Sequence, residues 1–127
     1  LAQNMFISPP TLSQIAASAA FDSYEEAEDN VKRYAINRSI LMNELPSSGL
    51  DKLAPADGAF YIYADIAHFT NDSVEFCKRM LEEIGVACTP GLDFDPDRGD
   101  STLRLSFSGA EHDMIEACKR IKTWLNK

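Results

Sequence analysis

One arginine stands out as a candidate for ligand binding, because it lies in a strictly alternating segment. In residues 102–108 apolar side chains alternate with polar ones, and Arg104 lies on the polar side among threonine and serine hydroxyls. A period of two is typical of a half-buried strand. A guanidinium held by a strand can grip a planar carboxylate or phosphate through two parallel hydrogen bonds. The more common alternative is an arginine that is solvated on an open sheet face.

Metal binding has little support. The acidic loop over residues 93–100 superficially resembles a calcium loop, but glycine falls at its position 7 instead of 6 and Arg104 occupies position 12. An EF-hand needs a bidentate glutamate at that last position, so we expect a solvated loop. His68 and His112 have no cysteine or histidine at ligand spacing, and both are expected to be exposed.

Covalent chemistry has no candidate either. The three cysteines, Cys77, Cys88 and Cys118, fall on or near apolar positions, which predicts reduced, buried and inert thiols in a cytoplasmic protein. A lysine that forms a Schiff base needs a desolvated pocket or a cationic neighbour. None of the six lysines has such a context; they are Lys32, Lys52, Lys78, Lys119, Lys122 and Lys127.

The elements that would position Arg104 follow from hydrophobic periodicity and helix caps. Helices are predicted over residues 12–21, from 22 to about 45, from Asp72 to Gly85, and after a capping box of Ser108 and Glu111. Strands are predicted over residues 50–54, 59–66, 86–89 and 102–108. We expect the third helix to bury Val74, Cys77, Leu81 and Ile84, and the last to bury Met114 or Ile115, Cys118, Ile121 and Leu125. This order predicts an α+β fold with a small mixed or antiparallel sheet, preceded by a long helix.

Composition limits the partners. The net charge of −8 argues against nucleic acid and anionic membranes, which both need a basic surface. No apolar run reaches the ~20 residues of a membrane span, and the first residues do not form a signal peptide. The chain lacks an initiator methionine and is expected to be cut from a longer protein.

Two regions are expected. Residues 1–21 form an irregular segment and an alanine-rich helix, and residues 22–127 form a small α+β domain. The helix over residues 12–21 is apolar on nearly every side, so it needs burial between two bodies.

Four segments in register carry a family resemblance: residues 7–14 (ISPPTLSQ), 55–61 (PADGAFY), 85–94 (GVACTPGLDF) and 103–108 (LRLSFS). Together they resemble the C-terminal part of class I/II pyridoxal-phosphate-dependent aminotransferases, of the fold type I superfamily. The resemblance covers essentially the whole chain, but only the last portion of a family member.

The resemblance implies that the cofactor pyridoxal 5′-phosphate, its lysine and its phosphate-binding groups lie in a large domain before Leu1. It implies that Arg104 binds the α-carboxylate of an amino acid or 2-oxo acid substrate, and that Phe60 lies near the substrate pocket. Residues 4–8 would approach the active site of the other subunit in a homodimer. The chain by itself is therefore expected to be inactive.

Two alternatives stay open. Within the superfamily, the parent protein could be a lyase or synthase that uses the same cofactor. From a different class, the chain could be a free-standing α+β module in which Arg104 grips a small carboxylate ligand. A helix over residues 12–21 that packs fully within its own chain would favour the module.

Overall fold

The first of two compact units contains mainly helix. The computed structural model describes residues 9–126, and its chain divides into the units Leu1–Lys32 and Arg33–Lys127. The first unit holds α2 (Thr11–Ala19), a 3-10 turn (Ala20–Asp22) and the start of α3 (Tyr24–Glu44). Helix α2 contains no buried residue, and Leu12 is 80% exposed. A free-standing module would be expected to bury this apolar helix within its own chain, and the exposed α2 does not meet that expectation. The boundary expected between residues 21 and 22 stays a prediction.

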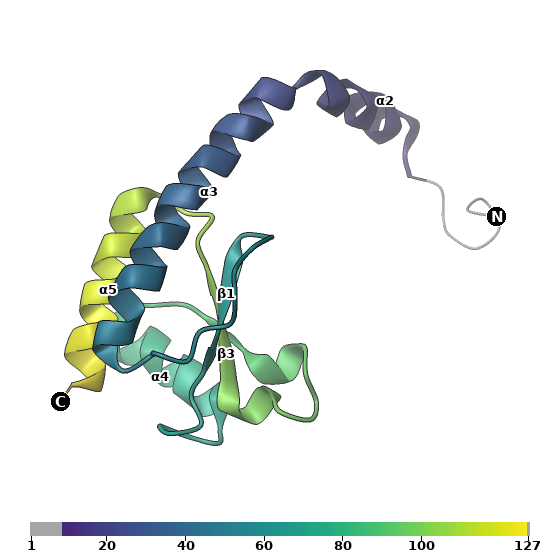
Figure 1. Cartoon of the computed structure of the whole chain (residues 1–127). Helices are drawn as coiled ribbons and strands as arrows, with labels where there is room; N and C mark the ends of the chain where they lie inside the picture. The colour runs from purple at the N-terminus through teal and green to yellow at the C-terminus, as the bar shows by residue number, and fades with distance from the viewer. Residues whose placement is uncertain (1–8, 127) are drawn as a thin grey trace. The chain divides into compact units, whose positions relative to one another are not determined.

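A three-stranded antiparallel sheet forms the centre of the second unit (Figure 1). Its strands are β1 (Tyr61–Asp65), β2 (Thr89–Pro90) and β3 (Thr102–Ser106), in the order β1-β3-β2. Because β3 is the middle strand, Arg104 has a neighbour on each side: Tyr63 on β1 and Thr89 on β2. The predicted α+β class with an antiparallel sheet is confirmed.

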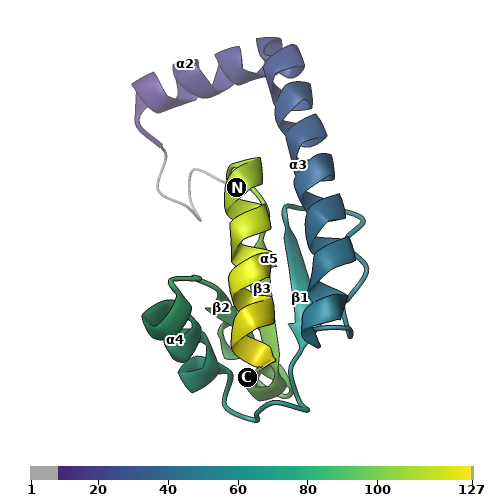
Figure 2. The same cartoon turned by 90° about the vertical axis from the view of Figure 1, so that its left-hand side faces the viewer.

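Helices cover one face of this sheet. Figure 2 shows α5 (Glu111–Leu125) and the later part of α3 on the same side of the sheet, with α4 (Ser73–Ile84) near β2. The alternation of β1 and β3 decides which side chains they cover, because Ile62, Ala64, Leu103 and Leu105 are all buried. The opposite side chains of the two strands are half-buried or exposed. The face that carries Arg104 is therefore the one that these helices do not cover.

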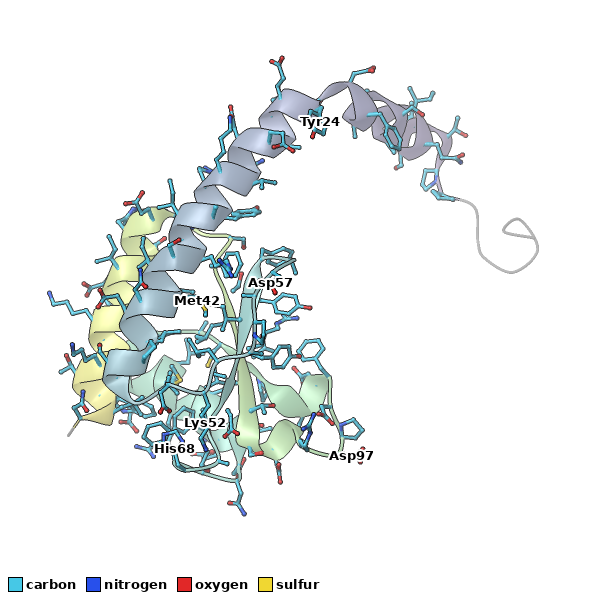
Figure 3. All side chains as sticks on the ribbon, in the orientation of Figure 1. Tyr24, Met42, Lys52, Asp57, His68 and Asp97 are labelled. Atoms are coloured by element: carbon cyan, nitrogen blue, oxygen red, sulfur yellow. The ribbon has the colours of Figure 1, made fainter. Side chains whose placement is uncertain are left out.

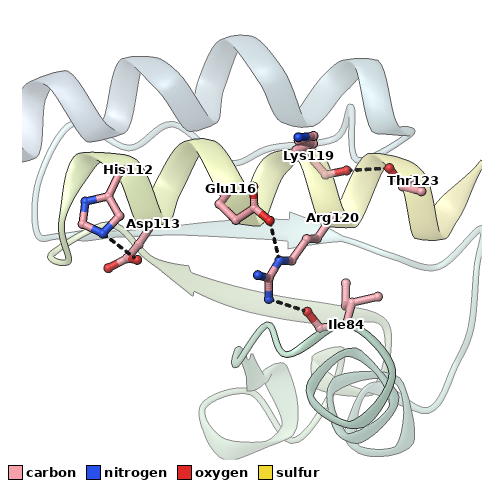
Figure 4. Close-up of polar contacts among 7 residues, drawn as sticks. All are labelled: Ile84, His112, Asp113, Glu116, Lys119, Arg120 and Thr123. Carbon is pink, nitrogen blue, oxygen red and sulfur yellow. Dashed lines mark hydrogen bonds and ion pairs between the residues drawn. The ribbon is translucent and has the colours of Figure 1, made fainter.

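Polar contacts fix the helices to the sheet and to each other. Asn37 of α3 is fully buried, and its Nδ2 donates hydrogen bonds of 2.9 Å to the carbonyl oxygens of Phe107 and Gly109, which follow β3. Arg120 of α5 donates to the carbonyl oxygen of Ile84 at the end of α4, at 3.1 Å (Figure 4). The Asn37 contacts thus fix the end of the segment that carries Arg104, and the Arg120 contact joins α5 to α4.

The caps of α4 are as predicted. The Asp72 carboxylate accepts a hydrogen bond from the Glu75 N–H at 3.0 Å, and Gly85 ends the helix with a left-handed φ of 66°. The cap predicted for α5 is wrong. Ala110 is its N-cap residue, without a side-chain bond, because the Ser108 hydroxyl pairs with the Ser106 hydroxyl at 3.0 Å.

All four predicted strands are shorter in the structure: residues 59–66 and 102–108 are reduced to Tyr61–Asp65 and Thr102–Ser106, and the other two differ more. Residues 50–54 form only an isolated bridge between Leu53 and Ala64, since Pro55 follows immediately and ends the pairing. The strand predicted over residues 86–89 is reduced to Thr89–Pro90, which leaves Cys88 in an irregular segment.

The buried faces of two helices also differ from the prediction. On α4, Val74 and Leu81 are 51% and 55% exposed, while Phe76 and Met80 are buried beside Cys77. On α5, Ile115 is 52% exposed, and Trp124 is buried in place of the half-buried Leu125. The helices are rotated toward the aromatic pair Phe76–Trp124, whose ring centroids are 5.1 Å apart. This contact joins α4 to α5 and was not visible in the periodicity.

Candidate functional site

Arg104 lies at the centre of the open sheet face. Strand β3 places it on the side opposite the buried Leu103 and Leu105, and it is half-buried. Its cross-strand neighbours Tyr63 and Thr89 are half-buried as well. The period-two interpretation of residues 102–106 is therefore confirmed, and the guanidinium is neither in the core nor fully solvated.

Two aromatic rings hold the guanidinium. The Cζ atom of Arg104 lies 4.4 Å from the ring centroid of Phe94 and 5.0 Å from that of Tyr61. Stacking of this kind is favourable for arginine because the ring faces carry negative charge. A contact of this kind supplies no hydrogen-bond acceptor to the N–H groups of the guanidinium.

No acidic side chain of the described residues neutralises Arg104. The described ion pairs and hydrogen bonds include none to its guanidinium, and its buried Nε has no hydrogen-bond partner. A buried charged donor without a partner is unusual, since such groups are costly to desolvate. An arginine with this environment is suited to accept an anion from outside the described chain.

The tyrosine beside Arg104 is affected by the same environment. Partial burial raises the pKa of Tyr63 above its ordinary value, and the positive charge of Arg104 opposes that rise. Tyr63 thus stays neutral near pH 7. Its ring lies 5.8 Å from that of Tyr61 and 6.3 Å from that of Phe94, measured between centroids. Arg104 thus lies beside an aromatic row that consists of Tyr61, Tyr63 and Phe94.

Phe94 lies in a tightly packed loop, which places its ring in this row. The loop runs from η3 (Gly91–Asp93) to η4 (Gly99–Ser101), and Asp97 at its tip is exposed (Figure 3). A Cβ atom on Gly91 would lie 2.7 Å from the carbonyl oxygen of Gly99 and 2.8 Å from that of Thr102. Only glycine, which has no Cβ atom, permits this close approach, so Gly91 and Gly99 can contact each other at the two ends of the loop.

Asp95 organises the same loop from within. Its carboxylate accepts hydrogen bonds from the N–H groups of Asp97 at 3.0 Å and Arg98 at 3.2 Å. These bonds hold the pKa of Asp95 below its usual value. Among the described residues, no three His, Cys, Asp or Glu side chains lie together in a group that could hold a metal ion.

Phe60 lies next to this site without contacting Arg104. It directly precedes β1 and is 47% exposed. Its ring centroid lies 6.0 Å from that of Tyr61 and 6.3 Å from that of Tyr34. Phe60 thus extends the aromatic row by one ring. Its role near a substrate stays a prediction, and residues 4–8, predicted to approach a second subunit, lie outside the described residues.

Sequence reasoning missed the rings that hold Arg104. Tyr61 and Tyr63 could have been found, because alternation along a paired strand puts both on the face of Arg104. Phe94 could not, since it lies in a loop whose path depends on the contact between Gly91 and Gly99. The exposed positions predicted for His68 and His112 are confirmed.

The described residues do not fit a pyridoxal-phosphate site by themselves. All five described lysines are exposed: Lys32, Lys52, Lys78, Lys119 and Lys122, of which Lys52 is labelled in Figure 3. A Schiff-base lysine needs a desolvated position. Within the described part of the chain, no helix is both long and apolar enough to cross a membrane.

Comparison with known proteins identifies the family. The model of the family "Aminotransferase class I and II" matches residues 1–121. The chain belongs to the class I and II aminotransferase family. It is 52% identical over 127 residues to the valine–pyruvate aminotransferase of Mycobacterium tuberculosis, covering 98% of this chain and 33% of that protein. A (5-formylfuran-3-yl)methyl phosphate transaminase of Methanocaldococcus jannaschii is 36% identical over 129 residues, covering 100% of this chain and 34% of that protein.

Solved aminotransferase structures share the fold. An aminotransferase from Mycobacterium tuberculosis superposes with a TM-score of 0.90 at 52% identity, over 97% of this chain and 32% of that one. A mutant of Thermus thermophilus aspartate aminotransferase gives a TM-score of 0.79 at 29% identity, over 96% of this chain and 33% of that one. The chain thus spans about a third of the length of these aminotransferase relatives.

Proposed function

We propose that this chain is the C-terminal, small domain of a pyridoxal-phosphate-dependent aminotransferase, in which Arg104 binds the α-carboxylate of the substrate. The observation that carries the proposal is the guanidinium itself, which is stacked on Phe94 and Tyr61 and lacks an acidic partner among the described residues. Its free edge can pair with both oxygens of a carboxylate.

The proposed substrates are an amino acid and a 2-oxo acid, which share a carboxylate and differ in their side chains. An arginine that grips the carboxylate fixes the orientation of the molecule, so the bond that reacts can be aligned with the cofactor. The cofactor would supply the amino-group chemistry when bound. Because the described lysines are all exposed, we place its lysine and its phosphate-binding groups outside them.

The relatives named above are all called aminotransferases or transaminases, which favours this reaction over a lyase or synthase. The exposed α2 disfavours a free-standing module. A homodimer of the full-length enzyme and a cytoplasmic location remain parts of the same proposal. Sedimentation of the full-length protein would test the dimer.

The test is Arg104→Ala in the full-length enzyme, with Arg98→Ala as the matched control. Arg98 is an arginine of the neighbouring loop whose side chain is 84% exposed. Loss of charged hydrogen bonds to the carboxylate should cost about 3–4 kcal/mol, which is roughly a 10²- to 10³-fold loss in kcat/KM.

The expected loss should also depend on the carboxylate. An amine substrate that lacks this group should react equally slowly with the Arg104→Ala variant and the parent enzyme. Near-native kinetics of Arg104→Ala with the amino acid, while Arg98→Ala is also unchanged, would contradict the assignment.

A further inference from the structure

Two cysteine side chains from different elements meet beside the sheet. The sulfur of Cys77, on α4, lies 3.3 Å from that of Cys88, in the irregular segment that leads to β2. The sulfur of Cys88 is also 3.5 Å from the Met80 sulfur. All three cysteines of the chain are free thiols in this structure.

The two thiols differ in burial and in acidity. Cys77 is buried, with 6% of its surface exposed, and Cys88 is half-buried. The hydrogen bond from Cys88 lowers the pKa of Cys77, and the same contact together with burial raises the pKa of Cys88. Cys77 is therefore the more acidic of the two thiols.

We propose that Cys77 and Cys88 form an oxidation site, in which a peroxide converts the two thiols into a disulfide between α4 and the segment that leads to β2. The contact of 3.3 Å must shorten to about 2.05 Å, a movement of roughly 1 Å. Cys88 can make this movement because it lies outside regular secondary structure. The expectation of three inert thiols would then hold for Cys118 alone.

The reaction balances in two steps. The Cys77 thiol releases its proton, its thiolate attacks one peroxide oxygen and the O–O bond breaks. The hydroxide that leaves takes up the proton released by Cys77, giving a sulfenic acid and water. The Cys88 sulfur then attacks the Cys77 sulfur, the S–O bond breaks, and a second water leaves with the Cys88 proton. In total the thiols lose two electrons and two protons, and one peroxide becomes two waters.

The third cysteine is an internal control. Cys118 on α5 is buried, and burial raises its pKa to about 11. No bond of its thiol to another sulfur occurs among the described residues. It should therefore react slowly with both peroxide and alkylating reagents.

Peptide mapping of the native chain tests the proposal. The chain is treated with a small excess of hydrogen peroxide, free thiols are alkylated, and the product is digested with trypsin without reduction. Trypsin cuts after Lys78 and Arg79, between the two cysteines, so a disulfide joins the peptides of residues 53–78 and 80–98. The mass of the two disulfide-linked peptides should be lower by two hydrogen atoms than the summed masses of the separate peptides. This linked species should disappear after reduction.

Matched variants distinguish this site from general oxidation. Cys88→Ser should abolish the joined pair, and Cys118→Ala should leave its yield unchanged. In guanidinium the selectivity should be lost, so that Cys118 also enters disulfides. The proposal is overturned if native Cys77 and Cys88 are recovered alkylated, or if Cys88 is oxidised further to a sulfinic acid without linkage.

Discussion

Arg104 owes its setting to aromatic rings, and this decides what it can bind. The ring centroids of Phe94 and Tyr61 lie 4.4 Å and 5.0 Å from its Cζ atom, whereas no described carboxylate pairs with its guanidinium. An arginine neutralised by a neighbouring carboxylate would gain little from a substrate. Here a carboxylate ligand would supply the first full counter-charge, which makes the site selective for anions.

We expect Phe94→Leu to weaken substrate binding without removing Arg104. Loss of the ring over the guanidinium should cost about 1–2 kcal/mol, which corresponds to roughly a 5- to 30-fold increase in KM. Steady-state kinetics of the full-length enzyme would measure it. Phe69→Leu is the control, because Phe69 stacks on Phe76 instead. Equal effects of the two substitutions would contradict a specific role for Phe94.

The loop that carries Phe94 should depend on pH through Asp95. Backbone N–H groups of Asp97 and Arg98 lower the pKa of Asp95 from its usual value of 3.8. A lowered folded pKa stabilises the folded chain fully above 3.8, and this contribution is lost as the pH falls through the folded value. Denaturation measured against pH should show the loss, and Asp95→Asn should reduce it. An identical pH profile for the variant would refute this role.

At the scale of elements, a short middle strand and a glycine contact together build the site. Strand β3 places Arg104 between β1 and β2. The close contact between Gly91 and Gly99 folds the loop that precedes β3 over the same face. Helices α3, α4 and α5 fill only the opposite face. The open face therefore remains available for a ligand or another domain.

We expect Gly91→Ala to destabilise the chain. Its new Cβ atom would lie within 2.8 Å of two carbonyl oxygens, so the loop must move away from β3. Overpacking of this kind costs about 1–3 kcal/mol. Urea denaturation would measure it, with Gly58→Ala as the control, because a Cβ atom at Gly58 meets nothing within 4 Å. Equal stability of both variants would contradict the tight contact.

Asn37 should be the most sensitive polar residue of α3. Its amide donates to the carbonyl oxygens of Phe107 and Gly109 in the buried interior, and replacement by alanine leaves both without this donor. We expect Asn37→Ala to lower the free energy of unfolding by about 2–3 kcal/mol. Ser39→Ala, on the exposed side of the same helix, is the control for the denaturation experiment. A small change at Asn37 would show that water replaces the amide.

At the scale of the whole molecule, the described residues include the substrate-binding arginine that we propose, and none of their lysines is suited to the cofactor. We therefore expect the 127-residue chain to be inactive and not to bind pyridoxal phosphate specifically. Mixing the two and scanning for a specific absorbance band would check this. A saturable band that one lysine substitution abolishes would overturn it.

The sequence alone determined the class of fold, the helices and the face of Arg104, because these depend on local periodicity and capping. The α4 caps at Asp72 and Gly85 and the alternation of β3 needed no distant contact. The family could also be identified at this stage, since four short segments kept their order and spacing.

Only the tertiary structure decided which residues surround Arg104. Phe94 reaches it through a glycine contact between distant parts of a loop, and Trp124 rotates α5 by packing on Phe76. The two sulfurs of Cys77 and Cys88 meet because the strand predicted from residue 86 begins only at Thr89 and leaves Cys88 in an irregular segment beside α4. Such contacts depend on how the elements pack, and the period of a single segment carries no information about its neighbour.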